Sequence, residues 1–556
     1  MVNEDKKLHE LFYSQFEEEM DNSPIMATWY GFKHEKYDYL LPDESLRGYE
    51  EKIKRYIKNK SEITYKINYE KLSPEGKLDY EVVVHFYDQL LFNLNELALW
   101  RSGAPGQGPI STVGKALYLL FSRDFAPMEI RVQTMIARLK LVPNFLVNSK
   151  SLWQFPVKLW TDMAIEEGRH TISFLKLIEQ TMEGNIAERQ LRDLKIAINQ
   201  ASEAIIEYVE WLKSDVLPRA VHNWSIGHQK FERFLELRKL GKTAKEILEI
   251  GEQVLVKTKK DLEVLANELF PGKTIAEVRE LLKKDYPTTF DEAIMITKEY
   301  IAEARRFIEK NNLMTLPNNE AIEVLPTPSF MIPIVPFAIH MPAEKFSNQF
   351  LGQYLITPVE DNLELLKEHS HAACKNKAVH EAYPGHHLQF VLSNSQANLI
   401  RSILFDHHFQ PVAGAEALEG WAHYCEQFMA EKNFLGKKEV FIQLIEQIWR
   451  AVRIIVDVKL HTGQMTFKEA KDFMMKEIGM AESSVLAELK RYTSRPTYPL
   501  SYLLGKTMLL ELRDEVKQKM GEKYNDKFFH DIILSNGGLP IFYLRKLFYL
   551  RISEIM

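Results

Sequence analysis

The sequence predicts a mainly α-helical protein with one small β element. In most of the 556 residues, apolar side chains recur every three or four positions, which is the spacing of one face of an α-helix. Residues 313–360 differ, because they are rich in proline and in β-branched or aromatic residues, and they predict short strands and extended loops. An apolar fraction of 46% and a charged fraction of 27% are those of a folded globular chain.

The N-terminal half reads as a series of helices. Helical spacing extends over residues 44–133, as in "LDYEVVVHFYDQLLFNLNELALW", and "SGAPGQGP" at residues 102–109 interrupts it as a loop. Further helices are expected in "AIEEGRHTISFLKLIEQTM" and "LRDLKIAINQASEAIIEYVEWLKSDVLP". Another should begin after Thr243, which forms a capping box with Glu246.

The predicted β element lies in "EAIEVLPTPSFMIPIVPFAIHM" and "FLGQYLITPVED", whose short apolar runs lack a helical period. "QYLITP", residues 353–358, fits either an edge strand that pairs with an extended peptide or a strand inside a small structural sheet. Helix is expected again from about residue 360. We therefore predict an N-terminal helical lobe (1–312), a segment of strands and loops (313–360) and a C-terminal helical lobe (361–556).

Composition argues against several classes of partner. A net charge of −6 and a pI near 6.3 give no polycationic surface for nucleic acid or anionic lipid. The first residues lack the features of a signal peptide, and no run approaches the roughly 18 apolar residues of a membrane span. Cys374 and Cys425 are too few to staple a chain of this length and suit a reducing cytoplasm, although a disulfide between them stays open. We expect a cytoplasmic protein that acts on a small molecule or short peptide.

"HEAYPGHHLQF", which begins at His380, combines a His-Glu pair with two more histidines. On a straight helix His387 would share the face of His380 but stand about 10 Å along the axis, too far for both rings to hold one ion. Pro384 lacks an N–H and crowds the preceding turn, and Gly385 permits unusual backbone angles, so the helix must bulge or break there. Such a distortion favours His386 over His387 as the partner of His380. Alternatively, the stretch only ends one helix and starts another.

A second polar cluster lies about forty residues later, in the helix-like segment "AEALEGWAHYCEQF". Its polar residues fall three and four positions apart and share one face: Glu416, Glu419, His423 and Glu426. Alone, this pattern is typical of a solvated acidic stripe. Together with the upstream histidines, it indicates a source for a third metal ligand, since buried carboxylates need a partner or a metal.

Two further segments carry arginines and tyrosines. "WRAVRIIVDVKLHTGQMTFKEA" places Arg450, Arg453, Asp457 and His461 on one helical face. "RYTSRPTYPLSYLLGK" contributes Arg491, Tyr492, Tyr498 and Tyr502. An arginine can bind a carboxylate through two hydrogen bonds, and a tyrosine hydroxyl can donate to a developing oxyanion. Each residue also fits a buried ion pair or a core tyrosine.

These blocks, in this order, resemble the bacterial family known as domain of unknown function 885: "HEAYPGHHLQ", "EGWAHYCE", "RIIVDVKLHTGQMTFKEA", "RYTSRPTYPLSYLLGK" and "FFHDIILSNGGLP". The resemblance covers most of the chain, including "MATWYGFKHEKYDYLLPD" near its start. That family is similar to the glutamate-type zinc peptidases, whose helical, two-lobed members include thimet oligopeptidase, angiotensin-converting enzyme and carboxypeptidase Taq. The resemblance implies a large, helical, two-lobed metallopeptidase-like body with a small β element around the active-site cleft.

Position by position, the resemblance implies His380, His386 and Glu419 as metal ligands and Glu381 as general base. The sequence departs from the named peptidases in two places. The longer spacing of its motif leaves His387 as a rival ligand. His423 stands where an aliphatic residue is expected, which changes the surroundings of the ligands.

We therefore predict a zinc-dependent hydrolase, a peptidase of short peptides, with one zinc ion per chain and one open position for water. Glu381 would accept the proton of the activated water and deliver it to the leaving amine. Candidates for oxyanion stabilisation are Tyr492, Tyr498, Tyr502 and His387. Candidates for binding a substrate carboxylate are Arg450, Arg453 and Arg491.

Two alternatives stay open at this point. One is a non-catalytic, metal-free helical scaffold that binds peptides or partners. The other is a metallohydrolase of non-peptide amides or esters. The sequence indicates neither the preferred peptide, nor exo- or endo-cleavage, nor the oligomeric state.

Overall fold

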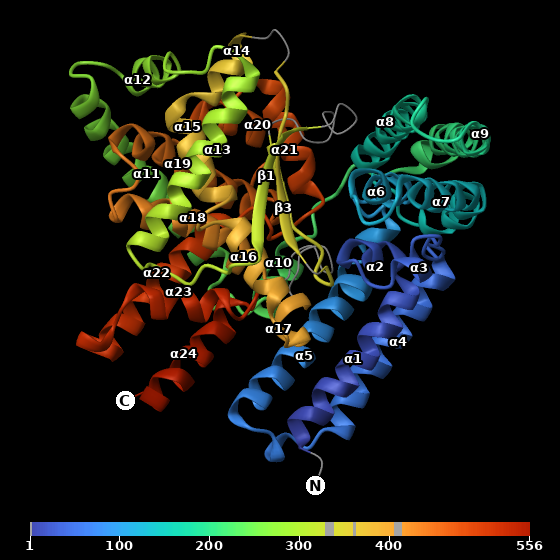
Figure 1. Ribbon diagram of the computed structural model, residues 1–556, viewed down its shortest axis with the longest axis horizontal. Helices are drawn as coiled ribbons and strands as arrows, with labels where there is room; N and C mark the ends of the chain where they lie inside the picture. Colours follow the sequence, from blue (N-terminus) through green and yellow to red (C-terminus); the bar gives the residue numbers. More distant parts are fainter. Residues whose placement is uncertain (1–2, 328–337, 348, 360–362, 405–413, 556) are drawn as a thin grey trace. The chain divides into compact units, whose positions relative to one another are not determined.

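The computed structural model describes residues 3–327, 338–347, 349–359, 363–404 and 414–555. It is mainly α-helical with one small sheet, which confirms the predicted fold class (Figure 1). In the described residues, no helix has both the length and the hydropathy that a membrane-spanning segment needs. Cys374 and Cys425 are both buried and form no disulfide.

By contacts between residues, the chain divides into two compact units. The first comprises residues 1–76, 83–224 and 344–347, and the second comprises residues 77–82, 225–343 and 348–556. The predicted boundaries at residues 312 and 360 mark changes in composition, and both fall within the second unit.

The first unit is helical. Its α-helices are α1 (Glu4–Asn22), α2 (Pro24–Tyr30), α3 (His34–Tyr37), α4 (Leu46–Lys66), α5 (Pro74–Phe92, of which residues 77–82 count with the second unit), α6 (Pro109–Ser122), α7 (Met128–Ser149), α8 (Lys158–Met182) and α9 (Glu188–Trp211). The expected loop at residues 102–109 leads into α6, which begins at its last residue, Pro109. Apolar residues at helical spacing form the core, as with Leu8, Phe12 and Phe16 of α1, which are at most 3% exposed.

The second unit holds the sheet and the remaining helices. Before the sheet come α10 (His228–Leu237), α11 (Ala244–Leu269), α12 (Ile275–Leu282) and α13 (Phe290–Lys310). After it come α14 (Leu363–Leu366), α15 (His371–Glu381), α16 (His386–Ser395), α17 (Leu399–Ile403), α18 (Ala415–Glu431), α19 (Lys437–His461), α20 (Phe467–Ile478), α21 (Glu482–Thr493), α22 (Ser501–Met520), α23 (Asp526–Leu534) and α24 (Ile541–Ile555). The predicted capping box at the start of α11 is confirmed, since Thr243 and Glu246 bond to each other's backbone N–H.

The sheet has three strands in the order β1-β3-β2: β1 (Glu320–Pro326), β2 (Ala338–Met341) and β3 (Phe350–Ile356). β3 pairs with β1 in parallel, from Glu320 opposite Phe350, and with β2 antiparallel, from Ala338 opposite Ile356. Figure 1 shows β1 and β3 side by side in front of α16. The edge-strand interpretation of "QYLITP" is therefore wrong, because β3 is hydrogen-bonded on both sides. The part of the predicted strand region at residues 328–337 lies outside the described residues.

Two glycines let α18 and α22 cross at backbone contact. A Cβ atom added at Gly420 would lie 2.6 Å from Cα of Gly505, and one added at Gly505 would lie 2.0 Å from the carbonyl oxygen of Glu416. No side chain fits at either position without moving a helix backbone. This close crossing brings α18, which carries Glu419, against the start of α22, which carries Tyr502.

Candidate metal centre

The predicted distortion at Pro384 is a break between two helices. α15 ends at Glu381 and α16 begins at His386, so the intervening residues leave the helical path. The N–H of Gly385 donates to the carbonyl of Val379 at 3.0 Å, which folds the connection back onto the end of α15. A Cβ at position 385 would lie 1.8 Å from the carbonyl oxygen of His380, so only glycine fits.

The break brings His380 and His386 together, although they lie on different helices. Their ring centroids are 5.0 Å apart, and Nε2 of His386 lies 3.5 Å from Oε2 of Glu419 on α18. These three residues form a group in which one potential ligand atom of each lies within 4.8 Å of the others. Each is at most 9% exposed. The structure thus assembles the three residues that the sequence pointed to as metal ligands.

Glu426 fixes which nitrogen His380 presents. Its Oε1 lies 2.6 Å from Nδ1 of His380, and its Oε2 lies 3.3 Å from Nδ1 of His423. Because the ionised carboxylate can only accept, Nδ1 of His380 donates to it, and Nε2 is the nitrogen that remains to bind a cation. These contacts with two histidines satisfy the carboxylate of Glu426, which is 1% exposed, and a carboxylate in this position relative to a histidine is common in metal sites.

Tyr498 orients the carboxylate of Glu419 in a similar way. Its hydroxyl donates to Oε1 of Glu419 at 2.7 Å, which leaves Oε2 facing His386. The ring of Tyr498 packs edge-on against that of Tyr502, with centroids 6.0 Å apart. The three candidate donors are therefore Nε2 of His380, Nε2 of His386 and Oε2 of Glu419.

The electrostatics keep both buried carboxylates ionised. Burial raises the pKa of Glu419, but His386 and the hydroxyl of Tyr498 lower it more, so that it lies below its ordinary range. Burial likewise raises the pKa of Glu426, yet the hydrogen-bonded histidines bring it well below normal. Burial lowers the pKa of His423 to about 3, so this histidine is neutral and serves Glu426 as a hydrogen-bond donor.

The donor set fits zinc or a similar divalent ion. Two imidazole nitrogens and one carboxylate oxygen are among its usual ligands, and three protein ligands leave a position for water. At bond lengths near 2.1 Å, tetrahedral donors lie about 3.4 Å apart. The 3.5 Å between His386 and Glu419 matches this spacing, and small side-chain rotations would close the remaining separations of up to 4.8 Å.

Glu381, the predicted general base, follows His380 directly at the end of α15 and is partly buried. Its carboxylate makes no hydrogen bond or ion pair with any of the residues that the structure describes. No described side chain therefore holds this carboxylate in place.

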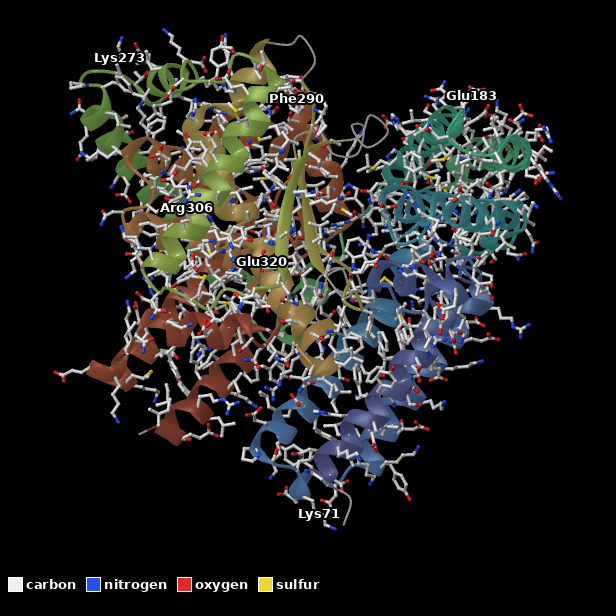
Figure 2. The ribbon with its side chains drawn as sticks, viewed as in Figure 1. Lys71, Glu183, Lys273, Phe290, Arg306 and Glu320 are labelled. Carbon is white, nitrogen blue, oxygen red and sulfur yellow. The ribbon has the colours of Figure 1, made fainter. Side chains whose placement is uncertain are left out.

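His387 takes part in a different network, which faces the sheet. Its Nε2 lies 2.7 Å from Oε2 of Glu320, and its Nδ1 lies 3.4 Å from Nε2 of His340 on β2. Glu320, labelled at the start of β1 in Figure 2, also accepts from the hydroxyl of Tyr383 and from Arg305. The structure thus places His387, 1% exposed, with Glu320 rather than with the candidate ligands, and gives it no position from which to act on an oxyanion there.

The predicted substrate arginines already have carboxylate partners. Arg450 binds Glu446 of its own helix. Arg453 and Arg491 both bind Glu488, at 3.1 and 2.8 Å. Tyr492 is also engaged, because its hydroxyl donates to Glu488 and accepts from Arg453.

Several residues that shape the site have partners too distant in sequence for spacing arguments to identify. Glu416 shares the predicted face of α18 but pairs with Arg238 at 2.6 Å, and Arg238 also binds the backbone of Thr497. The sequence placed Glu426 on the same face of the helix as Glu419, seven residues away, but did not predict a role for it. That spacing was the available signal that the two side chains lie on the same side of α18. Nothing in the sequence pattern pointed to Glu320 or Arg238.

A family model described as "Bacterial protein of unknown function (DUF885)" matches residues 24–547. No curated protein matches the chain. Among solved structures, a candidate lipoprotein of unknown function from Shewanella oneidensis is 21% identical with a TM-score of 0.77, covering 98% of this chain and 99% of the other. A candidate lipoprotein from Colwellia psychrerythraea is 20% identical with a TM-score of 0.84, covering 100% of both chains. At this level of identity the likeness is one of fold.

Proposed function

The chain belongs to this bacterial family of unknown function, and we propose that it is a zinc-dependent hydrolase of short peptides. The observation that carries the proposal is the buried group of His380, His386 and Glu419. Glu426 and Tyr498 orient two of these three residues toward a common point.

A zinc ion bound by these residues would act as a Lewis acid and lower the pKa of a coordinated water to near 7. Glu381 would accept the proton of the attacking water on a carboxylate oxygen and transfer it to the leaving amine. Glu426 would hold the proton on Nδ1 of His380 throughout, because it accepts from that nitrogen. The roles of these two carboxylates therefore differ: Glu381 moves a proton, and Glu426 keeps one in place.

Among the three predicted tyrosines, Tyr502 is best suited to stabilise the oxyanion. Tyr492 donates to Glu488 and Tyr498 donates to Glu419, so both hydroxyl protons are in use. The hydroxyl of Tyr502 makes no hydrogen bond with the described part of the chain, and its ring packs against that of Tyr498. It is therefore free to donate to a developing negative charge beside Glu419.

The test begins with the metal content of the full-length protein, measured by mass spectrometry after zinc reconstitution and gel filtration. We expect one zinc per chain and zinc-dependent cleavage of peptides in a mixed library. Glu381→Gln should retain zinc but lose about 100-fold or more in kcat. Glu323→Gln, an exposed change on β1, is the matched control and should leave both unchanged.

Two results would count against the proposal. A folded protein that retains no zinc after reconstitution would favour a metal-free binding scaffold. A zinc-loaded protein that cleaves amides or esters but no peptide would favour a hydrolase of non-peptide substrates.

We propose the cytoplasm as the location because both cysteines are unpaired. The two solved neighbours are described as candidate lipoproteins, which suggests the cell envelope instead. Fractionation of cells that make the full-length protein from its natural gene, followed by immunodetection, separates the two locations.

A further inference from the structure

Three guanidinium groups and two carboxylates surround Tyr498 and Tyr502, which leaves an excess of one positive charge. Arg453 lies over Tyr502, Arg495 lies over Tyr498, and Arg491 interacts electrostatically with both tyrosines. Of the carboxylates, Glu488 binds Arg453 and Arg491, and Glu419 accepts from Tyr498. Burying unbalanced charges of one sign is costly, so such a region favours an anionic ligand.

Arg495 is in direct contact with no carboxylate among the described residues, although Glu488 attracts it from a distance. It forms no hydrogen bond or ion pair with any of them, and its Cζ lies 5.7 Å from the centroid of the Tyr498 ring. The side chain is only partly exposed, so water does not fully solvate it.

The position of Arg495 relative to the candidate metal ligands follows from its contacts. The guanidinium lies over Tyr498, whose hydroxyl is 2.7 Å from Oε1 of Glu419. The distances from Cζ of Arg495 to the ring centroid, from the centroid to the hydroxyl oxygen and from there to Oε1 of Glu419 add up to about 11 Å, so Cζ lies no farther than that from Oε1. Up to three extended residues, at about 3.3 to 3.6 Å each, fit into this distance.

We propose that Arg495 binds the free C-terminal carboxylate of a peptide, so that the chain removes one to three residues from the carboxyl end of its substrate. The planar guanidinium matches a carboxylate in geometry, and the bond is charge-assisted. Hydrolysis consumes one water: its oxygen joins the carbonyl carbon, the C–N bond breaks, and a proton passes to the leaving amine. The inference rests on the proposed hydrolase function, for which it defines the substrate class.

The cleavage experiment compares peptides that differ only at the C-terminus, one set ending in a free carboxylate and one in an amide. We expect the zinc-loaded full chain to release one to three C-terminal residues from the free acids, with kcat/KM about 10- to 100-fold higher than for the amides, which is the effect of one hydrogen bond to a charged group. Arg495→Gln should abolish this preference by slowing the acids alone. Arg495→Lys should retain part of it, and Arg233→Gln, an exposed change on α10, should leave it intact.

A binding experiment separates this inference from the proposed function. Titration calorimetry with the zinc-loaded Glu381→Gln chain measures the affinity for the same acid and amide peptides without turnover. Tighter binding of the acid that Arg495→Gln removes supports the inference even if no peptide is cleaved. Equal affinity and equal cleavage of acids and amides, in folded wild type and variants, overturns the inference and leaves the hydrolase proposal standing. Internal cleavage of blocked peptides would overturn it as well.

Discussion

Glu426→Gln tests the role of a residue that touches no metal itself. The substitution keeps the size of the side chain but removes the negative charge 2.6 Å from Nδ1 of His380. The site is buried, so water cannot replace the lost interaction, and a charge-assisted hydrogen bond is about twice as strong as a neutral one. We expect zinc affinity to fall by about 10- to 100-fold, the usual effect of losing such a partner, or about 1.4 to 2.7 kcal/mol.

The affinity can be measured by competition with a chromophoric chelator at pH 7.5, with circular dichroism to verify folding. Glu431→Gln is the matched control, because Glu431 lies on the same helix but pairs with Arg513. It should change zinc affinity less than twofold. If folded Glu426→Gln binds zinc as tightly as wild type, then Glu426 does not set the ligating nitrogen of His380, and the assignment of that nitrogen is refuted.

Three further predictions concern other parts of the chain. Gly385→Ala should destabilise the protein by about 3 kcal/mol or more in chemical denaturation, because the added Cβ would collide with a backbone oxygen. It should also weaken zinc binding. A stability unchanged from wild type would contradict the observed path of the connection between α15 and α16. His387→Ala should cost about 2 to 4 kcal/mol of stability but leave zinc affinity within about threefold, and loss of zinc would make His387 a ligand after all. Asp38 and Glu344 raise the pKa of His34 to about 9 despite its burial. Protonated His34 therefore stabilises the fold fully below pH 6.5, and this contribution to the free energy of unfolding is lost as the pH rises through 9. His34→Gln should therefore cost up to about 3 kcal/mol at pH 6 and much less at pH 9.5, and an equal loss at both pH values would contradict the shift.

The sequence was most informative where local physical chemistry decides the structure. Helical periodicity predicted the fold class, and Pro384 with Gly385 predicted that the helix could not pass straight through the motif. The sequence also favoured His386 over His387 as the partner of His380, because a distortion at Pro384 and Gly385 changes the direction of the residues that follow them. Whether that distortion is a bulge or a break depends on how the connection packs against the end of α15, and spacing contains no information on that.

Features set by distant partners could not be predicted. The sequence allowed β3 to be an edge strand, but β3 lies between β1 and β2. Both neighbours precede β3 in the chain, and the order of strands in the sheet depends on tertiary packing rather than on local sequence. His387 is held by Glu320, which lies 67 positions earlier in the chain. Arg453 on α19 binds Glu488 on α21, 35 positions later in the chain, so its spacing on α19 could not identify this partner.

The break between α15 and α16 has a consequence for the stability of the folded chain. In a motif on one continuous helix, two ligands would already be held in place by the same backbone. Here His380, His386 and Glu419 belong to three separate helices, so an ion bound by all three would be a cross-link among them. Zinc at 100 times its Kd would add about 2.7 kcal/mol to the free energy of unfolding, and the same atoms would serve both the chemistry and the tertiary structure.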